Sequence, residues 1–222
     1  MKKILLLLVI AVSFGASNSF AQADGEKALV DRANRLLDSS MASVNVRAQR
    51  FNEEMSRVNQ LKPFDSTSLT VEKIKSNRAS LKEFLSYLEV YRSLSAKLLA
   101  QVDDSIMALR ADAPRSHRET YLQEFQEAVH KDQETFNKFT LALTSLWKKI
   151  DEVLEFLQNS KTELHGGKIQ FTVEDEYKKY QALMEEVNKL NKKASTAGSA
   201  SSKAAFEASQ VMNEAYGTGP KK

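Results

Sequence analysis

The sequence contains no cysteine, and proline and glycine are scarce, at three and seven among 222 residues. Without cysteine the chain can form no disulfide framework and can attach no haem through a Cys-x-x-Cys-His motif. Few prolines and glycines leave few helix breakers, so long uninterrupted helices are expected. Packing alone has to stabilise the fold, and a chain of this length can bury a sufficient core.

Residues that carry catalytic or metal chemistry are also scarce. The three histidines are His117, His130 and His165, and no two of them have helical spacing. Glu127 and His130 form one Glu-x-x-His motif, whereas a di-iron helical bundle needs two together with further glutamates. There is no Gly-x-Ser-x-Gly elbow and no glycine-rich phosphate loop. We therefore expect a protein without enzymatic activity, cofactor or metal ion.

The N-terminus has the pattern of a secretory signal peptide. Lys2 and Lys3 precede an apolar run at residues 4–14, and Ala21-Gln22-Ala23 has the form of a cleavage site. We expect cleavage after Ala23 and a periplasmic or secreted bacterial protein, although an uncleaved membrane anchor remains the alternative. Losing two lysines would lower the formal net charge from +3 to +1, so the basic composition does not indicate nucleic-acid binding.

The strongest pattern is a heptad repeat over residues 122–164. Its core positions are apolar except at Asp132 and Ser160, and the alternating spacing of three and four residues never slips. The first set of core positions comprises Leu122, Val129, Phe136, Leu143, Ile150, Leu157 and Leu164, and the second set comprises Phe125, Asp132, Phe139, Leu146, Val153 and Ser160. Such a stripe predicts one long helix that packs against others as in a coiled coil.

The remaining segments read as partners of that helix. Pro63 ends the first of them, Thr70 is a candidate N-cap, Ser116 and Glu119 form a capping box, and Gly166-Gly167 reads as a helix stop. We predict an all-α, elongated, antiparallel four-helix bundle. It forms one domain at residues 24–216, followed by a loose tail at 217–222, with helices at about 24–61, 71–110, 116–164 and 172–215.

Residues 194–209 are rich in alanine and serine, and the segment at 194–216 allows two interpretations. It forms either a disordered tail or a continuing helix with small side chains. In an antiparallel pairing with the long helix, Gly198 falls opposite Phe139 and Ala200 opposite Phe136. Small residues facing large ones would let the two helices interdigitate, so we favour a docked helix.

Two arginines lie at predicted core seams and need partners. Asp132 falls close to Arg92 when the two middle helices are folded against each other, which predicts either an ion pair that fixes the register or a locally open layer of the core. A polar ligand site inside the bundle is the alternative. Folding the first two helices together places Arg78 against Glu53 or Glu54.

The aromatic residues Trp147, Tyr177 and Tyr180 lie on neighbouring helices. We expect them to pack, with a partner-binding patch as the alternative, because rigid aromatic side chains dominate interface hot spots.

Two functional hypotheses follow. The first is an exported, non-enzymatic binding or scaffold protein, of chaperone or adaptor type, that docks an unknown partner protein on its helix faces. The second is weak binding to a membrane surface through the lysine-bearing C-terminal segment, with an apolar face formed by Phe206, Val211, Met212 and Tyr216. The sequence does not indicate an oligomeric state.

Overall fold

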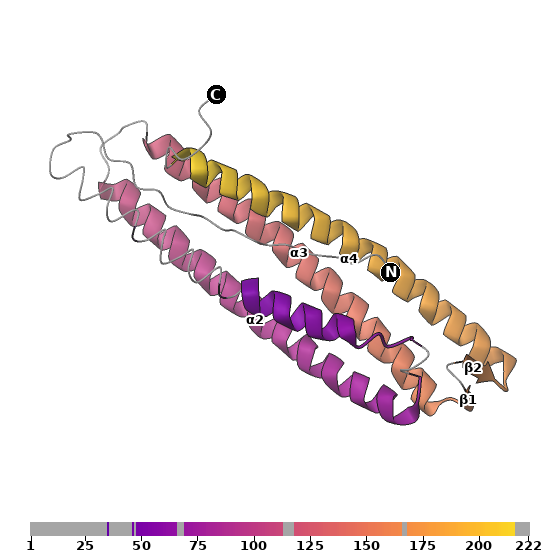
Figure 1. Cartoon of the computed structure of the whole chain (residues 1–222). Helices are drawn as coiled ribbons and strands as arrows, with labels where there is room; N and C mark the ends of the chain where they lie inside the picture. The colour runs from indigo at the N-terminus through magenta and orange to yellow at the C-terminus, as the bar shows by residue number, and fades with distance from the viewer. Residues whose placement is uncertain are drawn as a thin grey trace. The chain divides into compact units, whose positions relative to one another are not determined.

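The computed structural model describes residues 35, 46, 48–65, 69–112, 118–165 and 168–215. Residues 48–60 are helical and precede α2 (Val71–Asp112), α3 (Arg118–Asn159), β1 (Thr162–His165), β2 (Lys168–Phe171) and α4 (Glu174–Ala215), which Figure 1 shows. Positions 35 and 46 of the first predicted helix are also helical. The predicted signal peptide and the tail at 217–222 lie outside the described residues.

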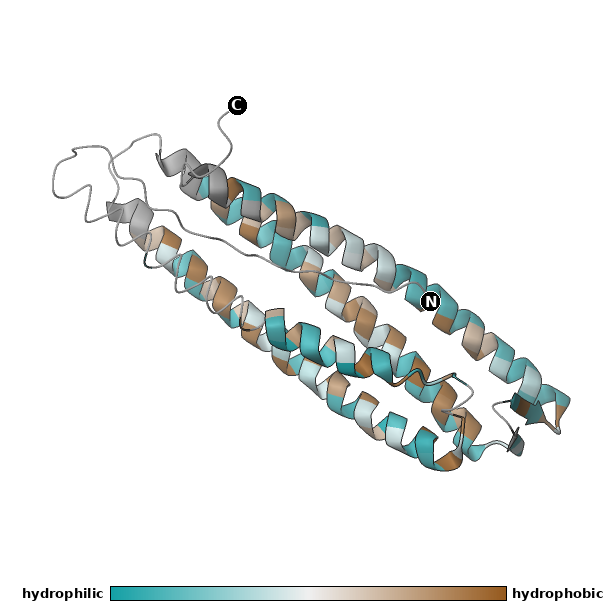
Figure 2. Cartoon of the chain, viewed as in Figure 1, coloured by the Kyte–Doolittle hydropathy of each residue, from teal (hydrophilic) through white to brown (hydrophobic). Residues whose placement is uncertain are grey.

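The chain divides into two compact units, and each long helix contributes to both. Unit 1 comprises Met1–Gln49, Ser93–Phe136 and Ser199–Lys222, and unit 2 comprises Arg50–Arg92 and Asn137–Gly198. The helices pack against one another in each unit, which confirms the predicted helical bundle. Hydrophobic residues recur between hydrophilic ones along every helix, as Figure 2 shows.

The helix at residues 48–60 ends, and α2 begins, where local sequence signals predicted. Lys62, next to Pro63, has a φ of 39°, a left-handed conformation that ends the helical stretch. At the start of α2, the Thr70 hydroxyl accepts a hydrogen bond from the backbone N–H of Lys73 at 3.3 Å. Glu72 lies in the first turn of α2, where the helix dipole favours a negative charge.

Aromatic side chains form much of the core of unit 2. The ring centroids of Phe51 and Tyr91 are 5.1 Å apart, and those of Phe51 and Phe139 are 6.2 Å apart. Phe84 meets Trp147 edge to face, with centroids at 6.2 Å. All five side chains are buried, so the helix at residues 48–60, α2 and α3 share one apolar core in this unit.

The core of unit 1 is aliphatic by comparison. Val102 and Ile106 of α2 pack on Phe125 of α3, and Leu98, Val129 and Val211 cover this cluster. Later residues of α2 meet earlier residues of α3, so the two helices are antiparallel. Val211 brings the last turns of α4 onto the same cluster.

The alanine- and serine-rich half of α4 is a docked helix, as predicted. Ala194, Ser201, Ala204, Ala205 and Ala208 are buried. A Cβ added to Gly198 would lie 3.0 Å from Cε2 of Phe139, closer than ordinary van der Waals contact. The large-against-small matching therefore holds at the pair that the sequence predicts.

The predicted end of the long helix is wrong. Helix α3 ends at Asn159, and residues 162–171 form an antiparallel hairpin in which Thr162 pairs with Phe171 and His165 with Lys168. Leu164, a predicted core position, is therefore in a strand. Gly166 and Gly167 follow β1 and precede β2 in the sequence, so the pair that was interpreted as a helix stop lies between two strands.

A candidate docking surface at the hairpin

Side-chain hydrogen bonds hold the hairpin between the two helices that it joins. The hydroxyl of Thr162 donates to the backbone C=O of Leu157, one of the carbonyls left unpaired at the end of α3. On the other side, the Thr172 hydroxyl donates to the C=O of Lys161 at 2.9 Å. The N–H of Lys161 donates to Glu176 Oε1 of α4 at 3.4 Å. These contacts tie β1 to both helices.

Aromatic side chains gather where β2 passes into α4. The ring of Phe171 lies 5.7 Å from that of Tyr177 and 5.2 Å from that of Tyr180. Tyr177 is 46% exposed and Val173 is 42% exposed, while Phe171 and Tyr180 are half-buried. We call these four residues the hairpin surface. It presents apolar side chains to solvent within unit 2.

Polar groups border the hairpin surface and fix its aromatic rings. Gln181 Nε2 donates to the Tyr177 hydroxyl at 2.8 Å, which holds the exposed ring in place. Burial raises the pKa of Tyr180 above its ordinary value, which further favours the neutral phenol. Lys178 and Glu174 form an exposed ion pair at 2.8 Å. An apolar centre with a charged border is the usual make-up of a protein-binding surface.

The structure separates the three aromatic residues that the sequence grouped as a patch. Trp147 is 7% exposed and packs on Phe84, so it belongs to the core. Tyr177 and Tyr180 lie together on the hairpin surface because both rings contact Phe171, a residue that the heptad pattern did not mark. The alternation of apolar and polar residues in Lys168-Ile169-Gln170-Phe171 was the available signal.

We expect the fluorescence of Trp147, the single tryptophan of the chain, to be that of a shielded indole. Its side chain is 7% exposed, so its emission should be blue-shifted and acrylamide should quench it poorly. Emission like that of free indole, with easy quenching in the folded protein, would contradict the position of Trp147 in the core.

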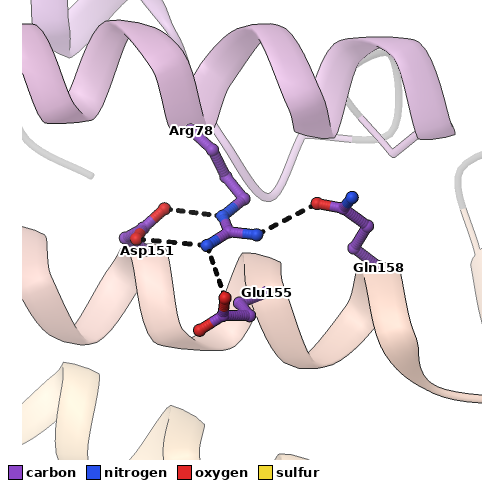
Figure 3. A network of polar contacts seen from close by, with 4 residues as sticks. All are labelled: Arg78, Asp151, Glu155 and Gln158. Atoms are coloured by element: carbon purple, nitrogen blue, oxygen red, sulfur yellow. Dashed lines mark hydrogen bonds and ion pairs between the residues drawn. The ribbon is translucent and has the colours of Figure 1, made fainter.

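Arg78 forms a partly buried polar network between α2 and α3, which Figure 3 shows. Its guanidinium donates to Asp151 Oδ1 at 2.8 Å, to Glu155 Oε1 at 2.8 Å and to Gln158 Oε1 at 3.0 Å. The hydrogen bond to Asp151 raises the pKa of Arg78 further. The carboxylates that meet Arg78 thus come from α3, and the predicted pairing with Glu53 or Glu54 is wrong.

Arg92 and Asp132 belong to different units, so their predicted ion pair stays a prediction. Burial raises the pKa of Asp132 to about 6, whereas a paired guanidinium would lower it. Arg92 Nε is buried and has no hydrogen-bond partner among the described residues. Arg92 therefore carries an unsatisfied polar group in unit 2, and the Asp132 carboxyl is shielded from water in unit 1.

No group of metal-ligating residues occurs in the described ranges. His130 Nε2 lies 2.8 Å from Asp103 Oδ1 within unit 1, and Gln126 Nε2 donates to the same oxygen at 3.0 Å. This arrangement joins α2 and α3 by a surface hydrogen-bond network. The Glu127 carboxylate instead accepts a hydrogen bond from Gln123 on the same helix.

No family model, curated protein or solved structure matches the chain.

Proposed function

We propose that this protein is an exported, non-enzymatic binding or scaffold protein that docks a partner protein on the hairpin surface. The observation that carries the proposal is the group of exposed and half-exposed apolar side chains around Phe171, since Tyr177 is 46% and Val173 42% exposed. Rigid aromatic side chains supply large contact area and dominate binding hot spots. A chaperone or an adaptor would use this surface in the same way.

The form of the leader supports export, because Lys2 and Lys3, a short apolar run and Ala21-Gln22-Ala23 stand in the order of a signal peptide. Among the described residues, no helix is both long and apolar enough to cross a membrane. The partner is then a protein of the same compartment.

The test compares two single variants of the mature protein. Tyr177→Ser removes an aromatic ring from the hairpin surface, and Leu141→Ser is the matched control because Leu141 is 47% exposed on α3. A crosslinking pull-down from periplasmic extract should lose its main partner with Tyr177→Ser, since truncating a hot-spot residue costs about 2 kcal/mol or more. It should keep that partner with Leu141→Ser.

Equal capture by both variants and the wild type would place the docking site elsewhere and sink this proposal. Melting temperatures of the three proteins provide the control for folding. They should agree closely, because surface substitutions usually change stability by less than about 0.5 kcal/mol.

Membrane-surface binding is the second candidate function. Phe206 is 62% exposed on α4, as a membrane-facing residue would be. Val211 instead packs on the cluster of Val102, Ile106 and Phe125, which removes it from the apolar face that the sequence suggested. Met212 has no described side chain, and Tyr216 lies outside the described residues. Flotation with anionic vesicles tests this candidate: co-flotation that Phe206→Ser abolishes would favour it over protein docking.

A further inference from the structure

The sheet of the hairpin has only two strands in the described part of the chain. In an antiparallel pair, residues alternate between pointing their N–H and C=O groups at the partner strand and pointing them away. The pairing of His165 with Lys168 closes the hairpin, and residues next to a two-residue connection form a hydrogen-bonded pair. By this alternation the backbone N–H and C=O groups of Lys168 and Gln170 point toward β1. Those of Ile169 and Phe171 point away from β1.

Lys161 supports this assignment from the other end of the hairpin. By the same alternation its N–H and C=O should point toward the side of β2 and α4. Its C=O accepts from the Thr172 hydroxyl, and its N–H donates to Glu176, so both groups point that way. The outer edge of β2 therefore presents the backbone groups of Ile169 and Phe171. The side chains of β2 are alternately exposed and half-buried, and among the described residues only β1 pairs with this strand.

We propose that the outer edge of β2 pairs with β2 of a second copy of this chain, forming a four-stranded antiparallel sheet around a twofold axis at Gln170. In this register Ile169 lies opposite Phe171 of the second copy, and Phe171 lies opposite Ile169. Both positions point their backbone groups outward, so these two pairs exchange hydrogen bonds. The axis also places aromatic against β-branched side chains, which is a favourable cross-strand combination.

Charge supports β2 rather than β1 as the paired edge. With the axis at Gln170, this neutral residue faces itself and Lys168 faces Thr172, so no like charges meet. On β1 the outward residues are Thr162 and Leu164, and an axis between them would place Glu163 opposite Glu163 of the second copy. Like charges directly opposite destabilise a sheet. Of the two edges, only that of β2 can pair through both of its outward residues without placing like charges opposite each other.

The expected dimer is weak. A strand of four residues buries much less than the roughly 1,200 Å² of a stable interface, so association should depend on concentration. The inference does not rest on the proposed docking function. The two surfaces share Phe171, but the dimer uses the backbone edge of β2, whereas partner docking uses the exposed side chains of Val173 and Tyr177. Each can fail without the other.

The test uses charge at position 170 of the mature protein. Gln170→Glu and Gln170→Lys should each dimerise about two- to fivefold more weakly than the wild type in sedimentation velocity, because each places like charges at the axis. An equimolar mixture should restore association and favour the mixed dimer, measured by energy transfer between differently labelled variants. Gln170 is exposed, but it pairs with Glu163 in its own hairpin, where Gln170→Glu places two carboxylates opposite each other. The melting temperature of each variant is therefore the control for folding, and the comparison rests on Gln170→Lys if Gln170→Glu melts lower.

A second variant tests the hydrogen bonds themselves. Ile169→Pro removes an outward N–H, which an edge strand tolerates, and the twofold axis doubles the loss. Its dimer should be at least about tenfold weaker, while the melting temperature of the monomer stays that of the wild type. A wild-type protein that remains monomeric up to about 1 mM would overturn the proposal. So would a dimer that is indifferent to charge at position 170 and to Ile169→Pro.

Discussion

Replacing Arg78 with methionine should lower the free energy of unfolding by about 3 kcal/mol. The side chains of Arg78 and Asp151 are 14% and 18% exposed, so the change leaves a carboxylate that is shielded from water and has lost its cation. Breaking a buried pair on one side costs about 3–5 kcal/mol. We expect the lower end of that range because Glu155, at 54% exposure, stays solvated.

Two comparisons separate charge from packing in this prediction. Arg57→Met is the matched control, because Arg57 and Glu83 are 60% and 65% exposed and exposed pairs contribute less than about 1 kcal/mol. The double variant Arg78→Leu, Asp151→Leu should be milder than Arg78→Met alone, since it leaves no uncompensated charge. Urea denaturation gives all four free energies. If Arg78→Met costs no more than Arg57→Met, the network does not stabilise the α2–α3 packing.

Replacing Asp132 with asparagine should stabilise the protein by about 2–3 kcal/mol at pH 8 and change little below pH 4. Burial raises the pKa of Asp132 from 3.8 to about 6. Between these values the folded state holds a proton that the unfolded state has released. Stability is therefore lost as the pH rises through this window, and the loss is complete above it. A difference of about two pKa units corresponds to about 3 kcal/mol.

Asp132→Asn also tests the predicted ion pair between Asp132 and Arg92. If the two residues pair, removing the carboxylate should instead destabilise the protein at pH 8 by about 3–5 kcal/mol. A double-mutant cycle with Arg92→Met would then show coupling energy. Denaturation of the single variants and the double variant is measured at pH 4 and pH 8. The sign of the change in the free energy of unfolding relative to the wild type is enough to distinguish the two outcomes.

The helices could be predicted from the sequence because their patterns are long and regular. The heptad repeat over residues 122–164 marks α3, and the small residues opposite Phe139 mark the docked half of α4. Both predictions rest on the spacing of apolar residues and on side-chain volume, and both properties can be read directly from the sequence. The position of Gly198 against Phe139 was predictable because a helix hairpin fixes its register over many residues.

The hairpin could not be separated from the helix on periodicity alone. Leu157 and Leu164 are seven residues apart, so the heptad pattern continues across the point where α3 ends at Asn159. The alternation in β2 covers only four residues, which is too short to compete with a long helical repeat. The hairpin surface was missed for the same reason, because Phe171 brings Tyr177 and Tyr180 together only through this strand.

The partner of Arg78 was mispredicted because α2 has two neighbours. A wide apolar face on α2 allows a polar residue at its border to meet either one. The sequence offered acidic residues on both sides, at Glu53 and Glu54 and at Asp151 and Glu155. Side-chain geometry decides between them, and the bidentate approach of Arg78 to Asp151 is a property of the folded structure.

Site-specific photocrosslinking from the hairpin surface tests the central functional claim most directly. A photoreactive amino acid would replace Tyr177 in one variant and Leu141, which has nearly the same exposure on α3, in the other. Irradiation in cells should give a discrete crosslinked protein from position 177 that is absent or much weaker from position 141. Crosslinks of equal pattern and intensity from both positions would contradict a docking surface at the hairpin.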